Sequence, residues 1–361
     1  MGKDVLVVGT GTIGEPLIGL LSDFREDIGI DNVYFYKRTP LLDEVAKVNS
    51  LIKRGARLVT TDDKVGATFE KIGNEVSSTF ASALETVRVV IDCTPAGNEN
   101  KEFYYYDRAY RDGLATDSPM FVAQGSEKGF GIPYAYGINN DALKGRHSSE
   151  KFIQIVSCNT HNIACLIKTL SGQNELVSSD FVCVRRANDV SQSGGYVASP
   201  TVGKHSDERF GTHHARDVYD LLSTVGQAPE VYSSAMKTNS QYMHTVRFSI
   251  TLKGDVSRDD VVERLESNPF VALTLKTCTN KVFSFGRDHG YYGRTYNHAV
   301  VSTPTLQVRT TPAGTNVTGY CFTPQDGNSL ISSVAATAFG LHGESYEKYL
   351  GFIDELLFDQ V

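Results

Sequence analysis

The chain has 361 residues, of which 35 are Lys or Arg and 42 are Asp or Glu, so its formal net charge is −7. This charge disfavours nucleic acid and anionic membranes as partners, and no apolar run reaches the ~18 residues of a membrane span. With 40% hydrophobic residues, the chain is long enough for two globular domains with sizeable cores.

The N-terminal segment predicts a nucleotide-binding turn. A β-branched run, residues 4–8, precedes Gly9-Thr-Gly11-Thr-Ile-Gly14, and apolar residues then follow at helical spacing. Between a strand and a helix, such glycines let the backbone approach a pyrophosphate that faces the helix N-terminus. We therefore expect Gly9, Gly11 and Gly14 to bind a dinucleotide; the alternative is a tight turn built from small residues.

The next predicted strand, residues 32–36, ends in Lys37-Arg38-Thr39. An NAD-selective site usually carries an Asp or Glu at this point, which accepts from the ribose 2′-hydroxyl. Two cations and a hydroxyl suit a 2′-phosphate instead, so the sequence favours NADP(H) over NAD(H). A solvated basic turn is the alternative.

Further along the chain, two kinds of strand are predicted. Buried runs at 88–92, 120–123 and 152–156 indicate a parallel sheet, whereas residues 244–252 alternate as in a half-exposed antiparallel strand. Glycine-rich segments at 191–196 and 286–293 predict long loops, and residues 330–358 have helical spacing. The predicted fold class is α/β: a Rossmann-type parallel-sheet domain (1–157, completed by 326–361) and an α+β catalytic domain with a mostly antiparallel sheet (158–325).

Six cysteines, at 93, 158, 165, 183, 278 and 321, form no CxxC pair, and the N-terminus shows no signal-peptide pattern. Reduced thiols in a cytoplasmic protein are therefore expected. Cys158 follows a predicted strand at the start of a predicted helix, where the helix dipole lowers a thiol pKa and backbone N–H groups can hold an oxyanion. We expect Cys158 to be a nucleophile and the other five to be buried structural thiols.

A thiolate nucleophile needs a base, and His244 is a candidate, although its place on the apolar face of its strand also suits a core histidine. His213 and His214, with only Asp217 nearby, lack a credible ligand set, so no metal is expected. Arg185 and Arg186 suit a phosphate or carboxylate, unless they are simply an exposed strand end.

Several motifs occur in one order: Gly9–Gly14, Asp92-Cys-Thr-Pro-Ala-Gly97, Gln124-Gly-Ser-Glu-Lys128, Ser157-Cys-Asn-Thr160, Val184-Arg-Arg-Ala187, His213-His214 and Met243-His244. With them the sequence resembles the archaeal-type (class II) glyceraldehyde-3-phosphate dehydrogenases over nearly its whole length. The resemblance implies that Cys158 is the nucleophile and His244 the acid/base, and that these enzymes are usually homotetramers accepting NADP(H), often with NAD(H) as well.

The resemblance also implies two groups of binding residues. The substrate anion would be bound by Thr160, Arg185, Arg186, His213 and His214. The cofactor would be bound by Gly9, Gly11, Thr12, Ile13, Gly14, Lys37, Arg38, Thr39, Thr94, Pro95, Gln124, Gly125, Gln325 and Asn328.

The sequence departs from the family pattern at two places. His161-Asn162-Ile163 follows Thr160 where the family usually continues with Thr-Gly, and Pro324-Gln-Asp-Gly-Asn328 matches the family's His-Gln-Glu-Ser only loosely. We interpret the first departure as a pocket rebuilt for another acyl group.

Three functions remain open from the sequence. Hydride exchange at a carbon bound to Cys158, with phosphate as acyl acceptor, converts glyceraldehyde-3-phosphate to 1,3-bisphosphoglycerate, and this is the first choice. With coenzyme A as carrier, the same scaffold would reduce malonyl-CoA or succinyl-CoA to a semialdehyde. A non-catalytic NADP(H)-binding regulatory protein is the third alternative, which an intact Cys158 and His244 disfavour. The expected partner is a small-molecule substrate, not nucleic acid or a membrane.

Overall fold

The structure is a computed structural model that describes residues 2–95, 105, 119–125, 127–189 and 194–361. The chain divides into two compact units. The first unit comprises Met1–Ile132, Leu143–Ile155 and Ser332–Phe352, and the second comprises Pro133–Ala142, Val156–Ile331 and Ile353–Val361. The chain therefore passes from one unit to the other several times.

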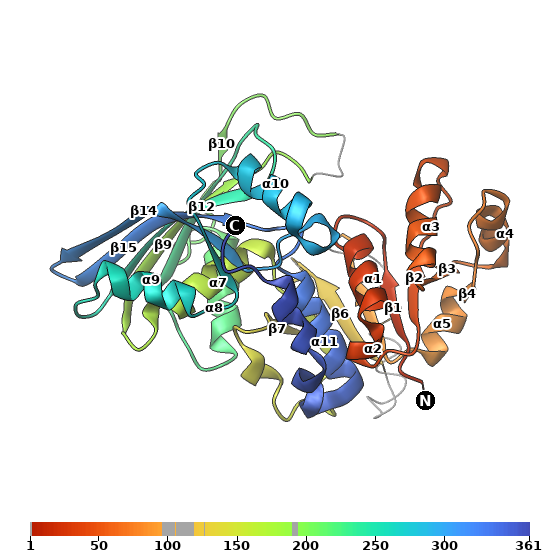
Figure 1. Cartoon of the computed structure of the whole chain (residues 1–361). Helices are drawn as coiled ribbons and strands as arrows, with labels where there is room; N and C mark the ends of the chain where they lie inside the picture. The colour runs from red at the N-terminus through yellow and green to blue at the C-terminus, as the bar shows by residue number, and fades with distance from the viewer. Residues whose placement is uncertain (1, 96–104, 106–118, 126, 190–193) are drawn as a thin grey trace. The chain divides into compact units, whose positions relative to one another are not determined.

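The first unit is built on an eight-stranded sheet with the order β4-β3-β2-β1-β5-β6-β8-β7 (Figure 1). Its strands are β1 (Val5–Val8), β2 (Val33–Tyr36), β3 (Arg57–Thr60), β4 (Ser78–Thr79), β5 (Val89–Asp92), β6 (Met120–Gln124), β7 (Ile132–Tyr134) and β8 (Phe152–Ile155). Neighbouring strands from β4 to β8 pair in parallel, which confirms the predicted Rossmann-type sheet.

Helices cover this sheet. They are α1 (Gly14–Asp23), α2 (Arg25–Ile28), η1 (Leu42–Glu44), α3 (Val45–Lys53), α4 (Asp63–Lys71), α5 (Phe80–Thr86), α11 (Leu330–His342) and η5 (Gly343–Tyr349). The chain passes between the units within the short helices η3 (Asn140–Leu143) and η6 (Gly351–Leu356). All four residues of β1 are buried, as in a strand covered on both faces. Helix α11 packs closely on the sheet, because a Cβ at Gly340 would lie only 2.6 Å from the Val89 side chain.

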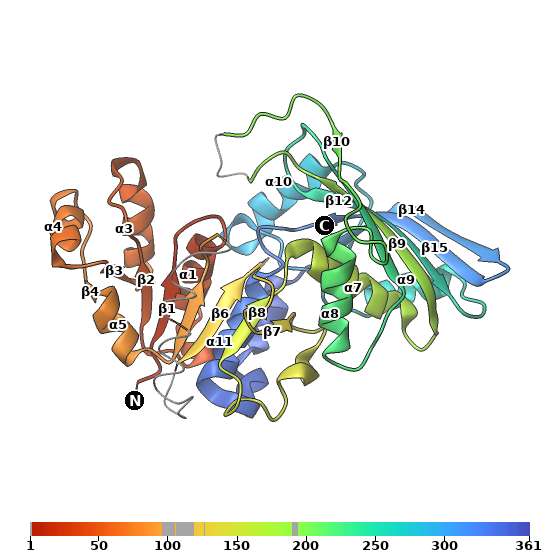
Figure 2. The ribbon, with the colours of Figure 1, turned by 180° about the vertical axis from the view of Figure 1, so that it is seen from behind.

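The second unit contains a seven-stranded mixed sheet with the order β10-β11-β9-β12-β15-β14-β13, seen from behind in Figure 2. Its strands are β9 (Leu176–Arg185), β10 (Thr201–Val202), β11 (Val231–Lys237), β12 (His244–Leu252), β13 (Val271–Thr274), β14 (Ala299–Thr311) and β15 (Gly314–Thr323). Its helices are α7 (Cys158–Ser171), α8 (His213–Ser223), α9 (Arg258–Glu266), α10 (Thr279–His289) and η4 (Tyr291–Gly293). Most of its strand pairs are antiparallel, as predicted.

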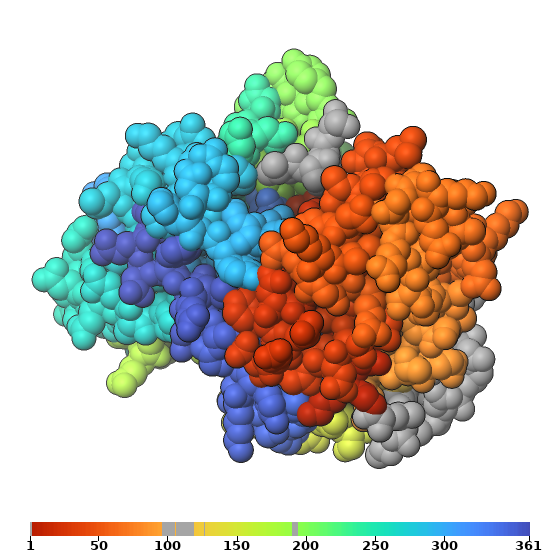
Figure 3. All heavy atoms as spheres, turned by 45° about the vertical axis from the view of Figure 1, so that its right-hand side comes forward, coloured from red at the N-terminus to blue at the C-terminus, as the bar shows by residue number. Residues whose placement is uncertain are grey.

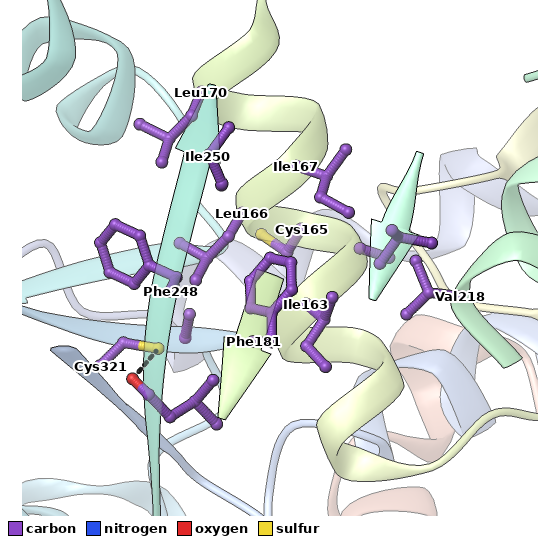
Figure 4. Packing of buried hydrophobic residues seen from close by; sticks show 14 of the residues in the cluster. Ile163, Cys165, Leu166, Ile167, Leu170, Phe181, Val218, Phe248, Ile250 and Cys321 are labelled. Atoms are coloured by element: carbon purple, nitrogen blue, oxygen red, sulfur yellow. Dashed lines mark hydrogen bonds between the residues drawn. The ribbon is translucent and has the colours of Figure 1, made fainter. Parts of the chain in front are cut away.

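The core of the second unit explains its two main elements. Strand β12 alternates buried and half-buried residues along its whole length, so one face of the sheet is apolar. Helix α7 lies against this face, and Figure 4 shows Leu166 and Leu170 beside Phe248 and Ile250. Cys158, at the first position of α7, is thus fixed by the packing of the helix that follows it.

The loop predicted at 286–293 is wrong in its first half, because α10 continues to His289. Gly286 is buried inside this helix, and a Cβ there would lie 2.7 Å from the Thr295 hydroxyl oxygen. The glycine allows close packing and does not mark a turn. Part of the other predicted loop, residues 191–193, lies outside the described residues.

Among the described residues, no helix is long and apolar enough to cross a membrane.

Candidate active site

Cys158 begins α7, and Ser157 caps that helix by accepting from the Thr160 N–H at 3.3 Å. Burial raises the pKa of the Cys158 thiol from its usual 9.0 to about 11, although the charge of Arg186 and a hydrogen bond from the Asn159 backbone lower it. The predicted lowering of this pKa is therefore wrong for the free protein. The thiolate loses more stabilisation from its lost hydration than it gains from the N–H groups at the helix N-terminus. The negative charge of Asp326 raises the thiol pKa further.

His244, the first residue of β12, is buried and held at two points. Its backbone N–H donates to Gln325 Oε1 at 3.0 Å, and its ring Nδ1 accepts from the Arg186 backbone N–H at 3.0 Å. A backbone N–H can only donate, so Nδ1 carries no proton and the ring proton lies on Nε2. Burial, followed by the charges of Arg186 and Arg185, holds the pKa of His244 well below its usual range, so the ring is neutral.

The backbone before His244 has an unusual conformation. Tyr242 and Met243 both have positive φ angles, 62° and 31°, which side-chain-bearing residues rarely adopt. Two such residues in succession turn the chain sharply just before the histidine. The histidine that follows is already in the β12–β15 pair, opposite Thr323.

A short segment after β15, residues 324–328, hydrogen-bonds to the backbone of both Cys158 and His244. Gln325 accepts from the His244 backbone N–H, and the Asn328 amide donates to the Cys158 carbonyl at 2.9 Å. Between them, Asp326 accepts two hydrogen bonds from the Arg186 guanidinium, at 3.0 and 3.2 Å. The sequence analysis assigned Gln325 and Asn328 to the cofactor and overlooked Asp326. The structure shows all three engaged with the segments that carry Cys158 and His244.

The two arginines differ in environment. Arg186 is only 5% exposed and also donates to Asp189 at 2.8 Å, so its charge is balanced within the protein. Arg185, at the end of β9, is exposed. Its charge lowers the pKa of both His214 and His244, which places it near these two rings. Of the pair, Arg185 has the guanidinium that can reach a ligand.

The histidine pair lies at the N-terminus of α8, with His213 exposed and His214 buried. Neither ring nitrogen of His214 has a hydrogen-bond partner among the described residues, and burial lowers the pKa of this ring to about 3. The helix is not capped by a side chain, because the Thr212 hydroxyl pairs with Ser233 instead. The described residues also contain no cluster of three or more His, Cys, Asp or Glu side chains that could hold a metal ion.

The residues that depart from the family pattern point into the core. His161 is fully buried, and its Nδ1–H donates to the Ser157 carbonyl at 3.0 Å. Asn162 is also fully buried, donates to the Thr323 hydroxyl at 3.1 Å and accepts from the Cys321 thiol. The interpretation of a rebuilt pocket loses its support, because these side chains lie beneath the helix that carries Cys158. Thr160 is likewise buried, with its hydroxyl paired to Ser157.

The other five cysteines do not share one environment. Cys165, Cys183 and Cys321 are buried, and burial raises the pKa of each thiol. Cys93 is half-buried and Cys278 is exposed. The expectation of a buried structural thiol is therefore wrong for Cys278.

The glycine turn fits a dinucleotide. Gly9 has φ 98°, and a Cβ at Gly14 would collide with the Gly9 carbonyl oxygen at 2.1 Å, so both positions require glycine. A Cβ at Gly11 would meet nothing within 4 Å, so packing within the protein does not explain this glycine. Close approach of a pyrophosphate to the N-terminus of α1 does explain it. Thr12 and Ile13, next to it, are half-buried.

The other predicted cofactor residues of the first unit lie at strand ends. Thr94, followed by Pro95, donates from its backbone N–H to Asp92 at 2.8 Å, and Gln124 donates to Ser333 at 2.8 Å. The Gly125 N–H donates to the Ile155 carbonyl at 2.8 Å. These ends lie at the carboxyl edge of the parallel sheet, where ligands of this fold bind.

Lys37 is buried, 8% exposed, and pairs with Glu44, which also pairs with Lys47. Arg38 and Thr39 are exposed. Glu44 was not predicted, because it is eight residues beyond the end of β2, where the acid is normally sought. An acidic turn, Asp43-Glu44, opening the next helix was the available signal.

No family model matches the chain. Curated relatives named glyceraldehyde-3-phosphate dehydrogenase do match it. The protein of Sulfurisphaera tokodaii is 27% identical over 79% of this chain and 78% of its own length, and that of Methanocaldococcus jannaschii is 26% identical over 85% and 86%. The protein of Aeropyrum pernix is 30% identical over 74% of this chain and 71% of its own length. At this identity and coverage, the chain belongs to the archaeal glyceraldehyde-3-phosphate dehydrogenase family, as a divergent member.

Proposed function

We propose that the protein is an NADP(H)-dependent oxidoreductase that converts glyceraldehyde-3-phosphate and phosphate to 1,3-bisphosphoglycerate through a thioester on Cys158. One observation carries the proposal: residues 324–328 hydrogen-bond to the backbone of Cys158, at a helix N-terminus, and to the backbone of His244, whose ring is neutral and oriented. The relatives bear the name of this activity, and the glycine turn fits the nucleotide.

The bound nicotinamide nucleotide would supply the hydride acceptor, held by the glycine turn and the N-terminus of α1. The protein's own part begins when the Cys158 thiol loses its proton to water and the sulfur adds to the aldehyde carbon, which forms a C–S bond and moves the carbonyl electron pair onto oxygen. His244 Nε2–H can donate to this oxygen, because its Nδ1 accepts from the Arg186 N–H. The Asn159 backbone N–H, which donates to the Cys158 sulfur, is a further donor, whereas the Thr160 N–H is bonded to Ser157.

With the nucleotide taking the hydride, the oxyanion would collapse to an acyl group on sulfur with no hydroxyl proton to remove. Hydrogen phosphate would then attack the thioester, lose its proton to water and release the thiolate. The sequence predicts His244 as the base of the reaction. This would require Nε2 to be free, so the ring proton would have to move to Nδ1 and the hydrogen bond from Arg186 would break. The orientation of the ring therefore supports a donor role.

For the anionic end of the substrate, we assign Arg185, His214 and the N-terminus of α8. Arg185 is exposed, and the nitrogens of the buried His214 ring have no hydrogen-bond partner among the described residues. Both electrostatically influence His244, so an anion held there would lie beside the reacting carbon. Arg186 serves instead to position His244, since its side chain is bound to Asp326 and Asp189.

The test is NADPH oxidation by the purified protein with 1,3-bisphosphoglycerate, malonyl-CoA and succinyl-CoA compared at equal concentration. We expect turnover with 1,3-bisphosphoglycerate, and none in Cys158→Ser with NADPH binding retained. Turnover with a CoA ester alone would replace phosphate by coenzyme A as the acyl carrier. Wild-type turnover in Cys158→Ser would refute the thioester mechanism.

A further inference from the structure

The end of β2 carries a cluster of three charges. Glu44 forms an ion pair with Lys37 through one carboxylate oxygen and with Lys47 through the other. Both lysines hold the pKa of Glu44 below its usual value although burial opposes this, so the carboxylate is charged. We call Lys37, Glu44 and Lys47 the β2 cluster.

The β2 cluster touches the glycine turn. Lys47 Nζ donates to the Thr10 carbonyl oxygen at 3.2 Å, and Thr10 lies between Gly9 and Gly11. The other end of the cluster is Lys37, the first residue after β2, where nucleotide-binding folds recognise the adenosine ribose. The carboxylate thus lies between the two regions that contact a bound dinucleotide. The segment that contains these residues belongs to the N-terminal part of the chain, coloured red and orange in Figure 3.

The charge balance of the β2 cluster determines whether it favours a 2′-phosphate or a ribose 2′-hydroxyl. Two lysines and one glutamate leave one net positive charge, whereas a 2′-phosphate carries about −1.5 to −2 at neutral pH. A phosphate placed here must compete with Glu44 for the same ammonium groups, and the two anions repel each other. A ribose 2′-hydroxyl causes no such conflict and can donate to a carboxylate.

We propose that Glu44 sets the cofactor preference: it supplies the carboxylate that the end of β2 lacks and limits the selection of NADP(H) over NAD(H). The inference rests on the proposed nicotinamide-nucleotide function. Arg38, exposed beside the cluster, remains the cation that a 2′-phosphate can reach without displacing an internal partner. The protein should therefore bind both nucleotides.

The experiment compares NADPH and NADH binding, by fluorescence titration, in the wild type, Glu44→Gln and Asp43→Asn. Asp43 is an exposed carboxylate in the same turn, so its variant removes an equal charge without touching the lysines. We expect Glu44→Gln to raise the ratio Kd(NADH)/Kd(NADPH) by about tenfold, and Asp43→Asn to leave it within about twofold. The reason is that only Glu44 competes with the phosphate for Lys37 and Lys47.

A ratio that does not move in Glu44→Gln, or that moves equally in Asp43→Asn, would overturn the role of Glu44 and leave the proposed function intact. Absence of binding of either nucleotide to the wild type would overturn both. If Glu44→Gln fails to fold because Lys37 loses its partner, the double variant Lys37→Met/Glu44→Gln removes the buried ammonium. It still frees Lys47, and the ratio must again rise.

Discussion

Alkylation of Cys158 in the free protein should require high pH. Its thiol pKa is raised from 9.0 to about 11, so the thiolate fraction at pH 7 is about 100-fold smaller than in an ordinary cysteine, a difference of about 2.7 kcal/mol. A helix N-terminus typically contributes only about 0.3–1 kcal/mol, which explains why burial prevails. The rate of iodoacetamide modification should thus rise about tenfold per pH unit from pH 7 to pH 10.

The assay follows the peptide that contains Cys158 by mass spectrometry after timed exposure to iodoacetamide. Cys278, which is exposed, provides the internal control for reagent access in the same digest. A rate for Cys158 that levels off below pH 8 would show an activated thiolate in the free protein. In that case burial would not be the main influence on the pKa of Cys158.

Four further predictions concern three charged residues and one buried histidine. Asp326→Asn should shift the alkylation profile of Cys158 to lower pH by about one unit, because Asp326 raises that pKa and opposes Arg186; an unchanged profile would contradict this. Arg186→Met should lower the free energy of unfolding in urea by about 3–5 kcal/mol, since it leaves Asp326 without its partner. Arg185→Ala, its matched control, should leave unfolding unchanged and reduce kcat/KM for the anionic substrate at least about tenfold; a loss of stability would make Arg185 structural. Burial lowers the pKa of His298 from 6.5 to about 4. The contribution of this neutral ring to the free energy of unfolding is therefore complete above pH 6.5 and is lost as the pH falls toward 4. In His298→Gln, the slope of the unfolding free energy against pH should decrease by about 1.4 kcal/mol per pH unit in this range.

The elements that the sequence predicts well are those whose pattern depends on a single buried face. Residues 244–252 alternate strictly and form β12 with the same bounds, and the glycine turn joins β1 to α1. The loop predicted for residues 286–293 is wrong in its first half because glycines are typical of turns. Gly286 instead lies in a helix, where contact with Thr295 leaves no room for a side chain. Local sequence does not reveal such long-range contacts.

The candidate site shows the same limit. The position of Cys158 at the start of a helix follows from its neighbours in sequence, but its pKa depends on burial and on charges such as Asp326, 168 residues further along. Glu44 was likewise invisible, because its pairing with Lys37 and Lys47 depends on how the turn after β2 folds back. Residue chemistry can be read from the sequence, whereas hydration and charge pairing require the fold.

The interleaved course of the chain has a consequence for its biosynthesis. Helix α11 packs on β5 and β6, yet the ribosome makes it long after β8. Because synthesis proceeds at about 5–20 residues per second, the apolar surface around Val89 and Met120 stays uncovered for roughly 10–40 s before α11 is made. During this interval the nascent first unit exposes sheet surface that a chaperone can bind. A fragment that ends before Ser332 would carry the same exposed surface permanently.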